Sequence, residues 1–323
     1  MTRRPLLIAA LGGNALLERG ESPDAETQRG NVRRAVTALA QLAGGRDLVV
    51  THGNGPQIGL LAMQSEALGT VPAYPLDILD AETEGMLGYL IEQELANRLP
   101  RRQVATLLTR VEVAADDPAF GAPAKPIGPI YDAERARELE RTRGWHMAEE
   151  SAGFRRVVAS PRPRRILELD TIRLLVDAGH VVVCAGGGGI PVMVDDAGDV
   201  RGAEAVIDKD HVSALLAREL AADMLLLLTD QPAVWSTWPP EGGRAIRSAS
   251  PEAMRRLRFE AGSMAPKVEA ACTFAEQTGR SAAIGALEDA ARIASGEAGT
   301  LIRTSAALTY YDAEPAPNVR RRR

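Results

Sequence analysis

The chain has 323 residues, of which 45% are hydrophobic and 25% charged, a composition typical of a globular protein and not of a disordered one. This length exceeds what one hydrophobic core usually organises, so we expect one large domain with two lobes, or two domains. A formal net charge of −5 provides no broad basic field, which argues against nucleic acid as the main ligand.

The first apolar run resembles part of an export signal, but it is short. Two arginines precede "LLIAAL", which Gly12 and Gly13 interrupt, and no small-x-small cleavage site follows. No apolar stretch in the sequence is long enough to span a bilayer. We therefore expect a cytoplasmic protein without membrane contact.

Short apolar runs alternate with segments of helical period along the chain. Five runs predict buried strands, namely "LLIAAL", "DLVVTH", "HVVVCA", "MLLLLTD" and "SAAIGAL". The predicted helices carry apolar faces at Val32, Val36, Leu39 and Ala43; at Met86, Leu87, Leu90, Ile91 and Leu95; at Val212, Leu215, Leu216 and Leu220; and at Val268, Ala271, Cys272 and Ala275. We expect Asp80 to be the N-cap of the second helix. This alternation predicts an α/β fold with a mostly parallel sheet covered on both faces.

Two segments depart from this alternation. Residues 114–163 are rich in proline, glycine and arginine and contain a polar helix near Ala133–Arg141. The segment is too long for a plain connection, so it is either a lid or a disordered insert. Residues 312–323, "DAEPAPNVRRRR", read as a flexible tail.

Cysteine and histidine are too sparse and scattered for a disulfide framework or a dedicated metal site. Cys184 and Cys272 lie far apart in apolar segments, which predicts small buried side chains in a reducing compartment. The four histidines form no HExxH pair, so we assign no protein residue as a metal ligand. For His52, in "THGNGP", we favour a structural role over that of a general base.

Three glycine-rich loops follow predicted strands. Gly12-Gly13-Asn14, Gly53-Asn54-Gly55 and Gly186–Gly189 expose backbone N–H groups at the carboxyl ends of strands, where α/β sheets bind ligands. Such loops favour anions, because the N–H groups and the N-terminus of the next helix are positive. Neither the Walker A pattern nor the dinucleotide pattern G-x-G-x-x-G matches, so a nucleotide would bind by another route.

Lysine is rare, which makes its positions informative. The chain has 35 arginines but only Lys125, Lys209 and Lys267. A compact ammonium on a flexible stem suits the charge of a phosphoryl group in transfer, whereas arginine suits static bidentate pairing. Lys209 and Lys267 fall at predicted helix N-termini, where the helix dipole disfavours a cation unless an anion compensates it. We therefore interpret the lysines as anion-binding groups, against the alternative of leftover surface lysines.

Three aspartates accompany the lysines. Asp208 and Asp210 flank Lys209, and Asp230 ends the run "MLLLLTD". Each aspartate is either a simple cap of a helix or turn, or a functional group. As a functional group, Asp210 either orients Lys209 or helps hold Mg²⁺ near phosphates. Asp230 is placed for a nucleotide contact.

Several stretches, in this order, resemble the carbamate kinases of the amino-acid kinase family over about residues 5–303. They are "ALGGNALLERGE", "THGNGPQIGLLA", "AETEGMLGYLIEQEL", "KPIGPIY", "RRVVASPRP", "GGGGIPV", "EAVIDKDHVSALLA", "LLLLTD" and "GSMAPKVEAA". The resemblance implies an open three-layer αβα sandwich and a cytoplasmic homodimer. It further implies reversible phosphoryl transfer, ATP + carbamate to ADP + carbamoyl phosphate, with Mg²⁺, used to make ATP in arginine or purine-derivative catabolism.

The resemblance also implies an organisation for the chain. Residues 1–311 would form the kinase domain. Its N-lobe, about 1–205, would bind the acceptor, with a lid insertion at about 112–158. Its C-lobe, about 206–311, would bind the nucleotide.

Site roles follow from the same resemblance, by position. Lys209, Lys267, Asp210 and Lys125 would be catalytic. Gly12, Gly13, Asn14, Gly53, Asn54 and Gly55 would bind carbamate and the transferred group. Gly187, Gly188, Thr229, Asp230, Met264 and Lys267 would contact the nucleotide.

Three alternatives remain at this level. The nearest is a kinase of another small carboxylate, such as an acyl amino acid. The second is a non-catalytic nucleotide-binding homologue, and the third is a nicotinamide-dependent oxidoreductase, which lacks its fingerprint here.

Overall fold

A mostly parallel sheet runs through the centre of the molecule. The computed structural model describes residues 3–18, 20–67, 72–150, 152–237, 242–260 and 262–313. The sheet order is β13 (Val234–Trp235), β14 (Ala245–Ala249), β16 (Thr300–Ile302), β15 (Ser281–Ala286), β12 (Met224–Thr229), β1 (Leu6–Leu11), β2 (Asp47–His52), β9 (Val181–Val183) and β3 (Val104–Thr106), and β17 (Thr309–Tyr310) pairs with β14. All five predicted strands are present in this sheet.

The strands near the middle of the sheet are parallel and buried on both faces. On β1, Ile8 pairs with Val49 of β2 and with Leu225 of β12. All six residues of β1 are buried, which explains why its sequence is a continuous apolar run without alternation.

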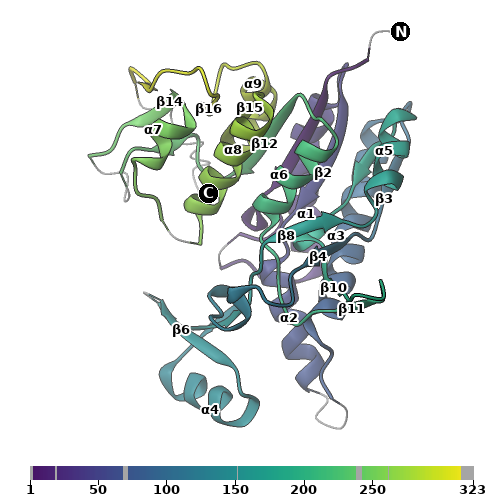
Figure 1. Ribbon diagram of the computed structural model, residues 1–323, viewed down its shortest axis with the longest axis vertical. Helices are drawn as coiled ribbons and strands as arrows, with labels where there is room; N and C mark the ends of the chain where they lie inside the picture. Colours follow the sequence, from purple (N-terminus) through teal and green to yellow (C-terminus); the bar gives the residue numbers. More distant parts are fainter. Residues whose placement is uncertain are drawn as a thin grey trace.

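Helices cover both faces of this sheet (Figure 1). The α-helices of the described residues are α1 (Ala25–Leu42), α2 (Gly55–Ala67), α3 (Leu76–Arg98), α4 (Ala133–Arg143), α5 (Leu169–Asp177), α6 (Lys209–Glu219), α7 (Pro251–Arg255), α8 (Met264–Thr278) and α9 (Ala290–Ala294). Residues of α1, α3 and α9 pack in one buried cluster, and residues of α5, α6, α7 and α8 pack in another. The α/β prediction is therefore confirmed.

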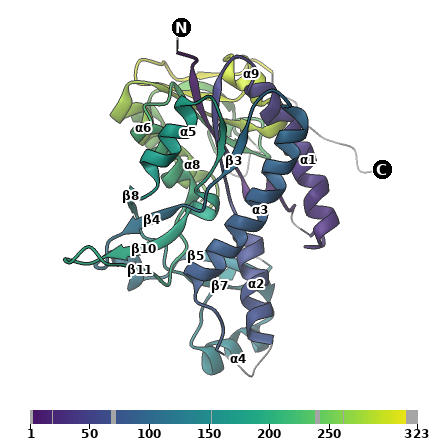
Figure 2. The ribbon, with the colours of Figure 1, turned by 90° about the vertical axis from the view of Figure 1, so that its right-hand side faces the viewer.

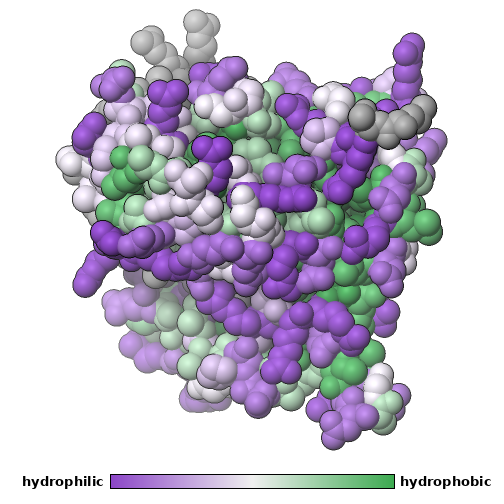
Figure 3. Space-filling view, turned by 45° about the horizontal axis from the view of Figure 1, so that its top comes forward, coloured by the Kyte–Doolittle hydropathy of each residue, from purple (hydrophilic) through white to green (hydrophobic). Residues whose placement is uncertain are grey.

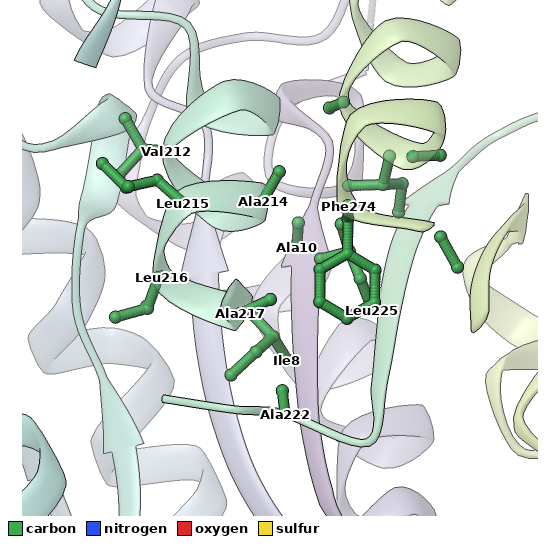
Figure 4. Packing of buried hydrophobic residues seen from close by; sticks show 14 of the residues in the cluster. Ile8, Ala10, Val212, Ala214, Leu215, Leu216, Ala217, Ala222, Leu225 and Phe274 are labelled. Carbon is green, nitrogen blue, oxygen red and sulfur yellow. The ribbon is translucent and has the colours of Figure 1, made fainter. Parts of the chain in front are cut away.

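Alternate residues of the central strands point into the two hydrophobic clusters on opposite faces of the sheet. Ile8 and Ala10 of β1 face α6 and α8, and Figure 4 shows Ile8 near Ala217 and Ala10 near Phe274. Leu7, Ala9 and Leu11 of β1 belong to the opposite cluster. The aliphatic core matches the low aromatic content of 4%.

The predicted helices are confirmed, with one corrected start. The second helix begins at Leu76, after Pro75 at the N-cap position, so the N-cap prediction for Asp80 is wrong. Asp80 lies inside the helix and is fully buried, while Met86, expected in the apolar stripe, is exposed. Proline favours the extended backbone before a helix, and Pro75 occupies the N-cap position five residues before Asp80.

The segment after β4 (Arg110–Val113) folds into a separate small sheet at one end of the molecule (Figures 1 and 2). It contains β5 (Lys125–Tyr131), β7 (Gly153–Val158) and β6 (His146–Glu150), all antiparallel, with α4 beside it. The predicted polar helix is α4, which Asp132 caps. The described part of this segment is therefore structured, and the disorder alternative is wrong.

The small sheet is joined closely to the body through α2 and a further sheet. A Cβ added to Gly59 of α2 would lie 2.0 Å from Gly128 Cα of β5, so the two backbones touch. The further sheet has the order β11 (Val200–Gly202), β10 (Ile190–Val194), β4 (Arg110–Val113) and β8 (Pro163–Ile166).

The remaining structural expectations concern cysteines, membrane contact and the chain end. Cys184 and Cys272 are buried free thiols, as predicted. Within the described ranges, no helix is long and apolar enough to cross a bilayer. On the face in Figure 3 hydrophilic residues predominate. Most of the predicted tail, residues 314–323, lies outside the described residues.

Candidate active site

The N-terminal turn of α6 holds two aspartates with one lysine between them. Asp208 caps the helix, and its Oδ1 accepts a hydrogen bond from Asp210 N at 2.9 Å. Lys209 and Asp210 are 8% and 3% exposed. Ser213 Oγ donates to Lys209 O at 2.6 Å and lies 2.7 Å from Thr51 Oγ1 of β2, which fixes this turn against the sheet.

The structure brings all three lysines to this turn. Lys209 Nζ lies 2.5 Å from Asp210 Oδ1, and Lys267 Nζ of α8 lies 3.3 Å from Asp210 Oδ2. Lys125 Nζ, from β5 of the small sheet, lies 2.9 Å from Asp208 Oδ2. Three ammonium groups therefore face two carboxylates. The excess positive charge suits an anionic ligand.

The ionisation of these groups is strongly coupled. Burial would raise the pKa of Asp210, but the ammonium groups of Lys209 and Lys267 outweigh it and lower the pKa. Burial lowers the pKa of Lys209, with Asp210 opposing and Lys267 reinforcing the change. For Lys267, burial acts in the same direction, but Asp210 and Asp208 outweigh it and raise the pKa. Asp210 is thus an anion that holds two cations.

Two glycine turns lie directly beside Lys209. Gly12 N donates to Leu228 O and Gly53 N donates to Leu11 O, both at 3.0 Å, so the turns continue the sheet ladder. A Cβ on Gly53 would lie 3.1 Å from Gly13 N and 3.5 Å from Lys209 Cδ. The turns thus contact each other and the lysine stem. Gly13–Ala15, which includes Asn14, forms a short 3₁₀ turn after Gly12, and Gly55 begins α2.

The third glycine loop packs on Asn54 of the second glycine turn and on Ile207. Gly187 has φ of 72°, and a Cβ there would lie 2.2 Å from Asn54 Nδ2. A Cβ on Gly188 would lie 2.4 Å from Ile207 O, one residue before Asp208. Both glycines are buried, and these neighbours belong to the second glycine turn and to the segment before α6, not to the end of β12 or to α8.

The end of β12 and the start of α8 form the opposite side of the site. Thr229 Oγ1 donates to Asp230 Oδ1 at 3.0 Å, and a Cβ on Gly12 would lie 3.9 Å from Thr229 Cα. Met264 is the first residue of α8, one turn before Lys267. Asp230 adds to the negative charge that raises the pKa of Lys267.

His52 is unsuited to general base catalysis. Burial lowers its pKa to about 4, so the imidazole is neutral at pH 7. Its Nδ1 lies 3.2 Å from Gly53 O, and a Cβ on Gly186 would lie 2.4 Å from its Nε2. These contacts indicate packing under the glycine loops.

Three polar residues on the buried face of α3 were missed by the sequence reasoning. Asn54 Nδ2 donates to Asp80 Oδ1 at 2.6 Å and to Thr83 Oγ1 at 2.8 Å. Glu84 Oε1 accepts from Gly186 N at 2.8 Å, and Glu84 Oε2 accepts from Thr109 N at 3.0 Å. Asp80 lies three residues before Thr83 and four before Glu84, so these side chains share the helix face of the predicted apolar stripe. Polar residues on that face were the available signal for a buried polar network.

Comparisons with known proteins agree on one family. The model of the "Amino acid kinase family" matches residues 5–286. A carbamate kinase of Rhizobium meliloti is 52% identical over 96% of this chain and 97% of its own length. A carbamate kinase of Haemophilus influenzae is 50% identical over 94% of this chain and 99% of its own. The structure of a Giardia lamblia carbamate kinase bound to AMP-PNP has a TM-score of 0.85 and 35% identity, covering 94% of this chain and 99% of that chain.

Proposed function

Because this chain belongs to the amino acid kinase family and its curated relatives at about 50% identity are carbamate kinases, we propose that it is a carbamate kinase. The reaction is ATP + carbamate to ADP + carbamoyl phosphate, in either direction. The chain is accordingly a phosphotransferase. Use of the reverse direction to make ATP in arginine or purine-derivative catabolism is part of the proposal.

The arrangement of the lysines is the observation that supports this proposal most strongly. Lys125, Lys209 and Lys267 come from three separate elements and meet at Asp208 and Asp210, beside the glycine turns. Phosphoryl transfer needs positive charge around the moving group and little other chemistry. A site with excess positive charge from three lysines provides that stabilisation.

The proposed step needs no general base. A carboxylate oxygen of carbamate attacks the γ-phosphorus of ATP, a new O–P bond forms, and the bond from that phosphorus to the β–γ bridging oxygen breaks. ADP leaves with the electron pair of that bond, and no proton is transferred. Carbamate is already an anion, so orientation and charge stabilisation suffice, consistent with a neutral, buried His52.

Each side of the site has a proposed role. Gly12, Gly13, Asn14, Gly53, Asn54 and Gly55 would hold carbamate and the transferred group. Thr229, Asp230 and Met264 would contact the nucleotide, with the C-lobe of about residues 206–311 supplying that side. The resemblance implied nucleotide contacts for Gly187 and Gly188; because they pack on Asn54 and Ile207, we propose instead that they shape the acceptor side.

The proposed catalytic residues have different roles. Lys209 and Lys267 would neutralise the moving phosphoryl group, and Asp210 would hold both ammonium groups in place. Lys125 would link the small sheet to Asp208. The small sheet lies within the proposed lid at about residues 112–158.

We propose that Mg²⁺ enters with the nucleotide. Within the described residues, no group of three His, Cys, Asp or Glu side chains is arranged to hold a metal ion, and both oxygens of Asp210 already face lysines. Mg²⁺ commonly binds through nucleotide phosphates with few protein ligands, and it would neutralise phosphate charge there.

The proposal includes a homodimer. Large apolar side chains are exposed at Ile78, Met86 and Tyr89, which recur on one face of α3, and at Leu108 beside it. Light scattering during size exclusion would test this: a mass near twice 34.4 kDa is expected, and a monomer at micromolar concentration would contradict it.

A substrate screen tests the function directly. ADP release would be measured with ATP and carbamate, acetate or N-acetylglutamate as the acceptor. Carbamate is expected to give the highest kcat/KM. An enzyme active on N-acetylglutamate but silent with carbamate would support the kinase of an acyl amino acid, and ADP binding without turnover would support a non-catalytic homologue. A nicotinamide-dependent oxidoreductase, the third alternative, would bind NAD in a titration where a carbamate kinase would not.

A further inference from the structure

Asn54 is held by a fully buried polar network on α3. Its side-chain nitrogen donates to Asp80 Oδ1 at 2.6 Å and to Thr83 Oγ1 at 2.8 Å. Asp80 and Thr83 are 0% exposed and Asn54 is 2% exposed. Water therefore cannot easily replace these partners, and the amide has one preferred orientation.

The chemistry of Thr83 determines that orientation. A hydroxyl has one hydrogen, and Thr83 Oγ1 donates it to Asp80 O at 3.0 Å. Thr83 Oγ1 can therefore only accept from Asn54, which means that the NH₂ of Asn54, not its oxygen, faces Thr83. Asp80 Oδ1 is likewise an acceptor. Burial raises the pKa of Asp80 well above its ordinary value, but a carboxyl protonated on Oδ2 still accepts at Oδ1.

Both amide hydrogens of Asn54 are therefore used within the protein. Among the described residues, no hydrogen bond reaches Asn54 Oδ1. Gly187 leaves just enough room for this amide, since a Cβ there would lie 2.2 Å from Nδ2 and 2.8 Å from Oδ1. The side chain has only an acceptor left for a ligand.

We propose that Asp80 is a positioning residue that makes Asn54 offer its carbonyl oxygen to the acceptor, so that the site favours an acceptor bearing an N–H group. The inference rests on the proposed function and specifies its selectivity. Carbamate carries an NH₂ group next to its carboxylate, whereas acetate has a methyl group of nearly the same shape. A site built to hydrogen-bond an N–H discriminates against an isostere without one, because its own polar group is left unpaired.

The test compares two phosphoryl donors in the reverse reaction. ATP formation from ADP would be measured with carbamoyl phosphate and with acetyl phosphate, and the ratio of their kcat/KM values would be taken. The wild type is expected to prefer carbamoyl phosphate. Asp80→Ala is expected to lower that ratio about tenfold, the loss of one buried hydrogen bond, mainly through a higher KM for carbamoyl phosphate. Activity with acetyl phosphate should change little.

Two variants serve as controls. Asp80→Asn retains an oxygen that can accept from Asn54, so its ratio should stay within about threefold of the wild type. Glu82→Ala changes an exposed residue of the same helix and should leave the ratio unchanged.

The outcomes separate the inference from the function. If Asp80→Ala unfolds cooperatively near the wild-type temperature and keeps the wild-type ratio of kcat/KM values, the inference is overturned. Equal losses of kcat/KM with both phosphoryl donors would show that Asp80 has a merely structural role, and they would overturn the inference as well. If Asp80→Ala does not fold, Thr83→Val removes one of the two acceptors and should lower the ratio about threefold, and an unchanged ratio there overturns the inference. A wild-type enzyme without activity on carbamoyl phosphate would overturn the proposed function itself.

Discussion

Lys267 Nζ lies 3.3 Å from Asp210 Oδ2, although 57 positions separate the two residues in the chain. The other oxygen of the same carboxylate faces Lys209, so one buried anion fixes two ammonium groups from two helices. A carboxylate shared in this way leaves positive charge available to a ligand.

Lys267→Arg should lower kcat by more than about tenfold in the ATP-forming direction, as expected when a positioned charge is displaced. The guanidinium retains the charge but is larger and planar, so it cannot occupy the same position beside Asp210. Steady-state kinetics would measure the effect, with the exposed Arg256→Lys as the control. Near-normal turnover would remove Lys267 from the proposed mechanism.

Asp210→Asn should reduce both activity and stability. The change removes the negative charge that compensates Lys209 and Lys267, and an uncompensated buried charge costs about 3 kcal/mol or more. Urea unfolding would measure the loss in the free energy of unfolding. Glu252→Gln, which breaks an exposed ion pair with Arg256, should cost much less. Equal, small effects in the two variants would contradict the shared-anion account.

Gly187→Ala should lower kcat/KM by more than about tenfold, because its Cβ would lie 2.2 Å from Asn54 Nδ2. Gly198→Ala is a matched control: its φ is also positive, at 88°, but a Cβ there meets nothing within 4 Å. Both variants should lose about 1 kcal/mol of stability from backbone strain. If the two variants had the same activity, Gly187 would have no role in placing Asn54.

Glu84 should make the protein less stable as the pH rises from about 4.5 to 8. Burial raises its pKa from 4.5 to about 8, although Thr109 N and Gly186 N donate to it. Below pH 4.5 the folded and unfolded chains both hold the proton. Between the two pKa values only the folded chain does, so the free energy of unfolding falls by up to roughly 1.4 kcal/mol per pH unit.

The Glu84 effect can be isolated with one substitution. Glu84→Gln removes the titration, and any cost of the amide that does not depend on pH cancels in the slope. Stability measured by urea unfolding from pH 5 to 8 should therefore fall less steeply in the variant than in the wild type. Parallel slopes would show that Glu84 does not titrate in this range. Glu82→Gln, on the exposed face of α3, should match the wild type.

Most of the fold could be predicted because local patterns specify it. The run "LLIAAL" is buried on both faces as β1, and Gly279 ends α8 in the left-handed conformation, as a glycine at a helix end should. The start of α3 could not be predicted in the same way. Asp80 looked like a cap because an acidic residue precedes an apolar stripe, but its partner is Asn54 in a distant loop.

Only part of the site could be predicted from the sequence. The rarity of lysine identified the three ammonium groups, but their convergence on Asp208 and Asp210 depends on how the fold places β5, α6 and α8. The orientation of Asn54 depends on Thr83, whose hydroxyl is committed to Asp80 O. The positions of Asp80 and Thr83 on the apolar stripe were visible in the sequence, but their hydrogen bonds with Asn54 were not.

The initial rate of ATP formation from ADP and carbamoyl phosphate, compared between the wild type and Lys209→Arg, tests the central claim most directly. The account predicts rapid ATP formation by the wild type and a rate more than about tenfold lower in the folded variant. Equal rates in the two proteins, or no ATP formation by the wild type, would contradict it.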